Sequence, residues 1–149
     1  KWNKNNIQIK LKKDIDFIKW RLGAPDKLYH IGLIKENKDP IGYCIFREVE
    51  KEGVPCVGIL DFYVVNEKKN KSVLLQEFII KISKKLEAEL VLIMLSHIQY
   101  KDYKFRKTGF LKTPFKFSFI SKLFDSGIDK NLFYNQKSWH LMWIDSDDL

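Results

Sequence analysis

The sequence has no long apolar run. Its longest unbroken stretch of apolar residues is six residues, Leu90 to Leu95, whereas a helix that crosses a membrane needs about twenty. The sequence therefore predicts no membrane-spanning helix and no membrane partner.

Arginine is also scarce, with only Arg21, Arg47 and Arg106 among 27 basic residues. Proteins that read nucleic acid depend on the forked donors of arginine, so this scarcity counts against a nucleic-acid partner. The formal net charge is nevertheless +8. That charge suits an anionic partner such as a nucleotide or coenzyme A, although a solvated lysine-rich surface would give the same value.

The chain has three histidines and two cysteines, with no spacing typical of metal ligands, so no metal site is predicted. Cys44 and Cys56 fall on neighbouring predicted strands, close to cross-strand register, where a disulfide is geometrically possible. We expect two reduced thiols instead, because free cysteine packs as a small hydrophobic residue. Reduced thiols fit a cytoplasmic location.

A chain of 149 residues, 45% of them apolar, predicts one domain with a hydrophobic core. Residues 1–13 are polar and basic, and they form either a linker or a first strand. A helix is predicted over 14–22, where Asp14 can cap its start and Gly23 can end it. Further strands are predicted over 29–35, 41–48, 115–120 and 138–144.

The most informative stretch lies between Cys56 and Phe110. A predicted strand over 56–65 leads through the polar turn 66–72 into an amphipathic helix over about 73–87, which is followed by an apolar strand over 90–95. The buried stripe of the helix is predicted to include Val73, Phe78, Ile80 and Ile82. A short turn between strand and helix directs the first free N–H groups of the helix at one spot, which suits an anion such as phosphate.

This order of elements, together with the Gly109-Phe110 pair, resembles the GNAT superfamily of acyl-CoA-dependent N-acyltransferases over roughly residues 28 to 120. The resemblance implies an α/β (α+β) fold, with a mixed, mostly antiparallel sheet and helices on its faces. It also implies that the turn and helix hold the pyrophosphate of coenzyme A and that the two strands splay apart for its pantetheine arm. Acetyl-CoA or another acyl-CoA would be the cosubstrate, and a small amine the acceptor.

The GNAT pyrophosphate turn usually has the pattern Gln/Arg-x-x-Gly-x-Gly/Ala. Two registers can be aligned with residues 67–74, and neither contains a glycine. The resemblance assigns cofactor binding to Lys69, Asn70, Lys71 and Ser72, with Leu74 at the last small position of one register. Alternatively, this segment is a solvated turn that only starts the helix.

Many GNAT enzymes use a tyrosine as general acid, four residues before the glycine of the Gly-Phe pair. Phe105 stands at that position here, so Tyr103 would have to substitute. His97 follows the second strand, where it is either a base or a hydrogen-bonding residue. Asp61 either positions or deprotonates an amine, or satisfies backbone groups at a bulge, and it needs a polar partner if it faces inward.

The pair Trp20-Arg21 and the terminal Trp139-His140-Leu141 resemble the second, motif-poor half of tandem GNAT proteins, which often accompany polysaccharide or cell-envelope biosynthesis. The first residue is Lys1 rather than Met, which fits a fragment of a longer protein. We therefore expect a weakened N-acetyltransferase-like domain that works with a second GNAT-like domain in cis on an amine or amino sugar. The alternative is a non-catalytic anion- or protein-binding module that has kept the fold.

Overall fold

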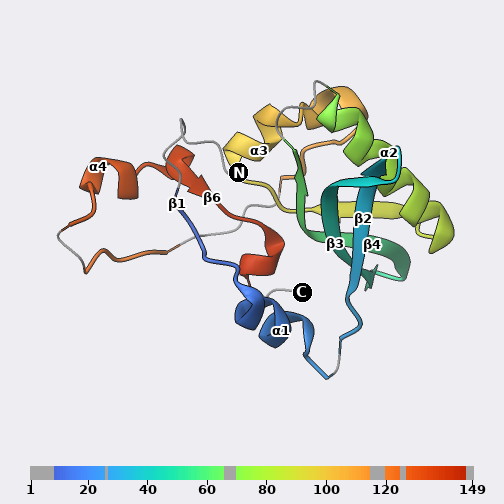
Figure 1. Cartoon of the computed structure of the whole chain (residues 1–149), viewed down its shortest axis with the longest axis horizontal. Coiled ribbons are helices and arrows are strands. Elements are labelled where there is room, and N and C mark those ends of the chain that lie inside the picture. Colours follow the sequence, from blue (N-terminus) through green and yellow to red (C-terminus); the bar gives the residue numbers. More distant parts are fainter. Residues whose placement is uncertain (1–8, 26, 66–69, 115–119, 125–126, 147–149) are drawn as a thin grey trace.

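A four-stranded sheet forms the centre of the computed structural model, which describes residues 9–25, 27–65, 70–114, 120–124 and 127–146. The strand order is β2-β3-β4-β5 (Figure 1), with β2 to β4 antiparallel and β5 parallel to β4. The strands are β2 (His30–Glu36), β3 (Asp39–Lys51), β4 (Val54–Val64) and β5 (Leu90–Ile93). The predicted fold class and the predicted strands 29–35, 41–48, 56–65 and 90–95 are confirmed within a few residues.

Two tight hairpins build the antiparallel part of the sheet. Asn37 and Lys38 join β2 to β3, and Glu52 and Gly53 join β3 to β4. All four have positive φ, between 50° and 80°. Two-residue turns of this type match the right-handed twist of the strands they join, so the meander is fixed locally.

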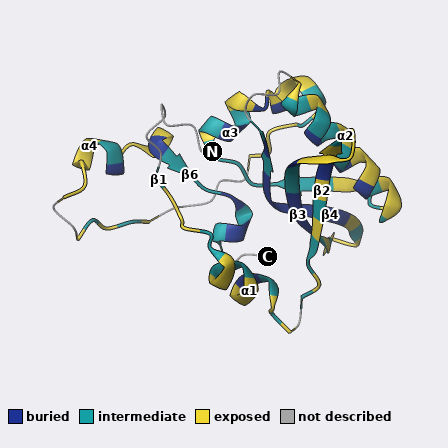
Figure 2. Ribbon diagram, in the orientation of Figure 1, coloured by how far each residue is buried: buried dark blue, intermediate teal, exposed yellow. Residues whose placement is uncertain are grey.

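Helix α2 (Lys71–Lys85) crosses one face of this sheet and buries Leu75, Ile79 and Ile82. The helix begins two residues earlier than expected, and Asn70 is its N-cap. The predicted buried stripe was partly wrong, because Val73 and Ile80 are exposed. In Figure 2 the exposed residues lie along the side of α2 that faces away from the strands.

Phe78 of α2 packs directly on the backbone of β2. A Cβ atom added at Gly32 would lie 2.3 Å from Phe78 Cζ, so a glycine is required where the ring meets the strand. Phe46 of β3 contacts the same ring edge-on, with centroids 6.3 Å apart. Phe78 is half-buried rather than buried, because it lies over the strand nearest the sheet edge.

The two ends of the described chain meet beside the sheet. Helix α1 (Ile15–Leu22) is capped by Asp14 and followed by Gly23, as predicted. Its Arg21 is buried, and its guanidinium donates from Nε to the carbonyl oxygen of Ile144 (3.2 Å) and from a terminal nitrogen to that of Ser146. These carbonyl groups belong to or follow the short helix η3 (Trp143–Asp145), so α1 is tied to the C-terminal region.

A smaller lobe lies to the left of the main sheet in Figure 1. Strand β1 (Ile9–Lys10) pairs in parallel with β6 (Trp139–His140), so residues 9–10 form a short first strand. The predicted strand 138–144 is shortened to β6, because the chain then turns into η3. Most of the predicted strand 115–120 falls outside the described residues. The remaining short helices are α3 (His97–Asp102), η1 (Phe105–Thr108), α4 (Lys130–Phe133) and η2 (Gln136–Ser138).

Both cysteines are free and buried, as predicted. Their expected cross-strand proximity was wrong, because Cys44 pairs with Phe62 and Cys56 pairs with Val49 along the β3–β4 ladder. Within the described ranges, no helix combines the length and the apolar character that a membrane crossing needs.

Two adjacent isoleucines test the orientation of α2. Ile79 is 2% exposed and Ile80 is 46% exposed. We expect Ile79→Ala to lower the free energy of unfolding by about 2–5 kcal/mol, because it leaves a cavity against the sheet. The matched control Ile80→Ala should cost less than about 1 kcal/mol, since its side chain already contacts solvent. Urea denaturation measures both values, and similar losses for the two variants would contradict this orientation.

Candidate active site

Strands β4 and β5 part in the middle of the sheet. Their parallel pairing runs from Cys56 with Leu90 to Ile59 with Ile93. Strand β4 then continues to Val64, paired with β3 but no longer with β5. The chain beyond β5 turns into α3 at Ser96. Pairing between β4 and β5 therefore ends two residues before Asp61, and beyond β5 Leu95 forms a bridge with Met142 instead.

An aromatic cluster of Phe62, Tyr103, Phe105 and Phe110 packs beside this separation. Phe62 of β4 contacts Tyr103 edge-on at a centroid distance of 4.8 Å, and Phe105 at 5.9 Å. Phe105 also contacts Phe110 at 5.0 Å and is 3% exposed. The residue at the position of the family's acid is therefore a core residue that joins η1 to β4.

Tyr103 is part of the same cluster and is anchored to the strand. Its hydroxyl oxygen accepts a hydrogen bond from the backbone N–H of Val64 (3.1 Å), and the Lys71 ammonium lies 4.8 Å from the centre of its ring. Burial raises the pKa of Tyr103 to about 12. A higher pKa makes the phenol a weaker proton donor near neutral pH, so its clearest role here is to hold α3 against β4.

Asp61 lies at a β-bulge at the point where β4 separates from β5. Ile45 pairs with Asp61 and Phe46 pairs with Ile59, which leaves Leu60 as the extra residue. The Oδ1 atom of Asp61 accepts the N–H of Phe62 (3.0 Å), and its Oδ2 accepts the hydroxyl of Tyr43 (3.1 Å). The backbone hydrogen bond at the bulge is therefore observed, and the Tyr43 hydroxyl is the polar partner that an inward-facing carboxylate needs. A role of Asp61 toward an amine stays a prediction.

Two further charged groups surround Asp61, and the sequence gave no reason to choose them. The Lys13 ammonium lies 3.2 Å from Asp61 Oδ2 and 3.3 Å from Asp145 Oδ2. Asp145 Oδ2 also accepts the N–H of Met142 (2.8 Å). Burial raises the pKa of Asp61, and the charge of Lys13 opposes that shift.

The structure separates the roles of two histidines. His97 is exposed at the start of α3. His140 of β6 is partly buried, and its Nε2 lies 2.9 Å from Nε2 of the buried Gln99. The Gln99 carbonyl oxygen accepts the N–H of Ser96 (2.9 Å), so His140 belongs to a polar chain that fixes α3. Burial lowers the pKa of His140 to about 4, with a smaller effect of Lys13 in the same direction.

The predicted cofactor-binding residues lie at the beginning of α2. Asn70 is its exposed N-cap and makes no side-chain capping bond, and Lys71 and Ser72 are the first two residues of the helix. Lys69 lies outside the described residues. Leu74 packs against the hydrophobic core, so its side chain does not crowd the start of the helix. The geometry leaves a lysine-bearing helix N-terminus suited to an anion.

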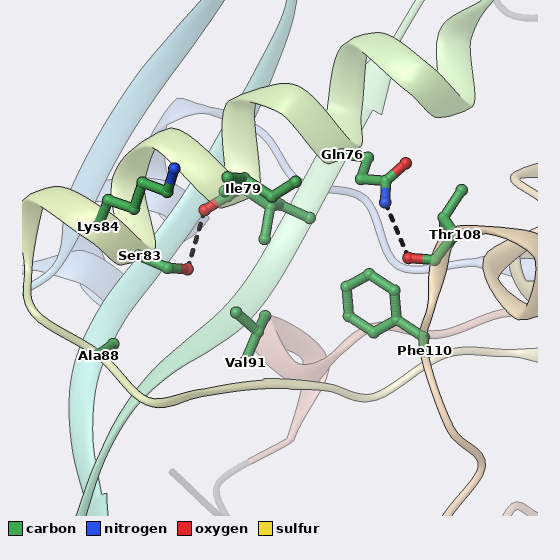
Figure 3. Close-up of a pocket in the computed structure, with 9 residues that line it drawn as sticks. Gln76, Ile79, Ser83, Lys84, Ala88, Val91, Thr108 and Phe110 are labelled. Atoms are coloured by element: carbon green, nitrogen blue, oxygen red, sulfur yellow. Dashed lines mark hydrogen bonds between the residues drawn. The ribbon is translucent and has the colours of Figure 1, made fainter.

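A small cavity of about 270 Å³ lies under the second half of α2 (Figure 3). In Figure 3, Gln76 donates to the carbonyl oxygen of Thr108 (2.8 Å), and Ser83 donates to that of Ile79 (2.9 Å). The cavity is mostly apolar, and none of the predicted site residues lines it. Its lining residues are Gln76, Ile79, Ile80, Ser83, Lys84, Ala88, Val91, Thr108 and Phe110. In the described part of the chain, no three His, Cys, Asp or Glu residues are grouped as a metal site would require.

Solved acetyltransferase structures share this fold. The ribosomal-protein-alanine N-acetyltransferase from Brucella melitensis biovar Abortus 2308 superposes with a TM-score of 0.54 at 10% identity, over 76% of this chain and 81% of that one. The aminoglycoside acetyltransferase meta-AAC0020, from an uncultured soil metagenomic sample, gives 0.51 in complex with trehalose and 0.50 in complex with sisomicin. Both structures of that enzyme are 15% identical to this chain in sequence. The alignments cover 81% and 80% of this chain and 79% of the enzyme in each case.

No protein-family model matches the sequence, and neither does any curated protein. At identities this low, the structural likeness shows the fold. The chain therefore has the GNAT-like fold of these acetyltransferases.

The anchoring role of Tyr103 predicts a specific loss of stability. Tyr103→Phe should lower the free energy of unfolding by about 1–3 kcal/mol, because it leaves the buried N–H of Val64 without its partner. The same change at Tyr134, which is 63% exposed, is the control and should have little effect. Urea denaturation compares the two variants. Equal stability of Tyr103→Phe and the unmodified protein would show that this hydrogen bond contributes nothing.

The lowered pKa of His140 predicts a dependence of stability on pH. The unfolded state takes up a proton near pH 6.5, whereas the folded state takes it up near pH 4. The contribution of neutral His140 is therefore complete above about pH 6.5 and is lost as the pH falls toward 4.

The raised pKa of Asp61 makes the folded state more stable as the pH falls, which is opposite to the effect of His140. The variant His140→Gln therefore isolates the contribution of the histidine. The stability difference between the unmodified protein and this variant should shrink between pH 7 and 4.5 in urea denaturation. Parallel curves would contradict the prediction.

Proposed function

We propose that this domain is of the acyl-CoA-dependent N-acyltransferase type, with weakened chemistry of its own, and that it acts together with a second GNAT-like domain in cis. The observation that carries the proposal is the separation of β4 and β5 after Ile59 and Ile93, with the buried carboxylate of Asp61 beside it. In this fold, such a separation is the place for an acyl group and its acceptor amine. The names of the structural neighbours, both acetyltransferases, support the same class.

The start of α2 is proposed to bind the pyrophosphate of the acyl-CoA. Lys71 and Ser72 occupy the first turn of the helix, where backbone N–H groups and the helix dipole favour an anion. No glycine occurs in residues 66–72, so the backbone cannot approach phosphate as closely as in the family pattern. We therefore expect a loosely held cofactor.

Two features support weakened transfer. Phe105 has no proton to donate, and Tyr103 is a poor acid because burial raises its pKa to about 12. An absent general acid typically costs about 10²- to 10⁴-fold in rate. Asp61 remains the best-placed group to receive a proton from an amine, and His97 is a less favourable base because it is exposed.

The finer parts of the proposal concern the setting of the domain. A partner domain in cis would supply the glycine-rich turn and the acid that this chain lacks, and the acceptor would be a small amine or an amino sugar. The two free, buried cysteines support a cytoplasmic location.

Calorimetry with acetyl-CoA tests the binding step. We expect binding that saturates below about 1 mM, in the usual range for enzyme substrates. Lys71→Ala should weaken this binding several-fold. The matched control Lys81→Ala should not, because residue 81 is exposed and lies near the middle of the same helix.

A thiol-release assay with a panel of amines and amino-sugar nucleotides tests the transfer step. We expect no appreciable release by this domain alone. Rapid release that disappears in Tyr103→Phe would contradict the weakened chemistry and identify Tyr103 as the acid. Absence of acetyl-CoA binding at millimolar concentration would overturn the acyltransferase proposal and favour the second candidate, a non-catalytic anion- or protein-binding module. That candidate is supported by the aromatic cluster that packs beside the separated strands.

A further inference from the structure

Three segments that are distant in sequence bring charged groups together on the sheet face opposite α2. Asp61 comes from β4, Asp145 from η3, and Lys13 from the stretch between β1 and α1. The side chains of Asp61 and Asp145 are 3% and 2% exposed, and that of Lys13 is 17% exposed. Buried carboxylates need charged or hydrogen-bonding partners. The question for this cluster is therefore which cation the two carboxylates bind.

The ammonium group of Lys13 is bound as a ligand would be. It lies between two carboxylate oxygens, 3.2 Å from Asp61 and 3.3 Å from Asp145, and the hydroxyl of Tyr43 completes the surroundings of Asp61. The other oxygen of Asp145, Oδ1, is buried and makes no hydrogen bond to any described residue. One ammonium therefore serves two carboxylates and leaves part of the site unsatisfied.

The segment that carries Lys13 reaches the rest of the fold through the Lys13 side chain and through Asp14, the N-cap of α1. Its two neighbours on the N-terminal side, Leu11 and Lys12, are exposed, and β1 before them pairs with β6 at Ile9 and Lys10. Lys12 is 87% exposed and pairs only with Asp14, across the start of α1. The Lys13 side chain is thus the inward contact of this segment, and it reaches the point where β4 and β5 separate.

We propose that Asp61 and Asp145 form a binding site for a primary alkylammonium ion, and that Lys13 occupies this site as an internal ligand. The inference deepens the proposed function, because an acceptor amine would enter where Lys13 now lies and the segment 11–14 would have to move aside. A simple bracing role for Lys13 is the competing explanation. It predicts that a free amine binds only after the Lys13 side chain has been removed, whereas an internal ligand predicts that excess n-butylammonium also competes with Lys13 and shifts the unfolding midpoint of the unmodified protein.

Removal of the lysine side chain tests the site without acyl-CoA. Lys13→Ala should lower the unfolding midpoint, because two buried carboxylates lose their cation. n-Butylammonium replaces the missing side chain and should restore the midpoint by about 3–6 °C at ten times its dissociation constant. n-Butanol, and sodium chloride at equal ionic strength, should not restore it. Lys12→Ala, the matched control on the neighbouring exposed lysine, retains Lys13 and should respond to none of these additives at the concentration that restores Lys13→Ala.

Lys13→Met covers the case in which Lys13→Ala does not fold. Methionine fills the space of the stem without the charge, so this variant separates lost packing from lost charge: it should stay less stable than the unmodified protein and remain insensitive to n-butylammonium. Circular dichroism then follows refolding of Lys13→Ala with and without the amine, and recovery that requires the amine supports the site. Failure of n-butylammonium to restore the midpoint or the fold of Lys13→Ala overturns the proposal.

The result is separable from that of the acyl-transfer assays. Amine rescue of Lys13→Ala without any acetyl-CoA binding would keep the ammonium site and reject the acyltransferase function. Acetyl-CoA binding without amine rescue would keep the function and reject the internal-ligand role of Lys13.

Discussion

The sharing of one lysine by two buried carboxylates is the constraint on which the rest of the structure depends. Asp61 is in the middle of the sheet, Asp145 is in the C-terminal turn, and Lys13 precedes the first helix. Their attraction, together with the contacts of Arg21 to the carbonyl groups of Ile144 and Ser146, holds both terminal regions against β4. The same contacts place a polar cluster where the pairing of β4 with β5 ends.

The aromatic cluster beside that separation is apolar. Phe62, Tyr103, Phe105 and Phe110 stack edge-to-face, and such contacts stabilise beyond the area they bury. The hydroxyl oxygen of Tyr103 accepts a hydrogen bond from the backbone N–H of Val64. The domain thus has the strand arrangement of the GNAT-like fold, while aromatic packing and a structural hydrogen bond account for Phe105 and Tyr103.

Local patterns made most of the fold predictable. The hairpins, α1 with its cap at Asp14, and the order of strand, helix and strand all follow from short-range signals. The buried side of α2 was only partly predictable, because Val73 and Ile80 share the apolar character of Ile79 but face solvent. Asp61 could be selected as a carboxylate in an apolar strand. Lys13 and Asp145 could not, because a lysine in a polar segment and an aspartate in an acidic terminal run have no pattern that distinguishes them from surface residues.

The packing of Phe78 on Gly32 has a consequence for how sequences with this fold can diverge. A Cβ atom at position 32 would lie 2.3 Å from the Phe78 ring, so any larger residue there requires a smaller one at position 78. Neither substitution is tolerable first without a loss of packing, and the two positions should therefore covary, with bulk at one balanced by its absence at the other. Covariation at positions 32 and 78 would therefore identify related chains even where every motif around the separated strands has changed.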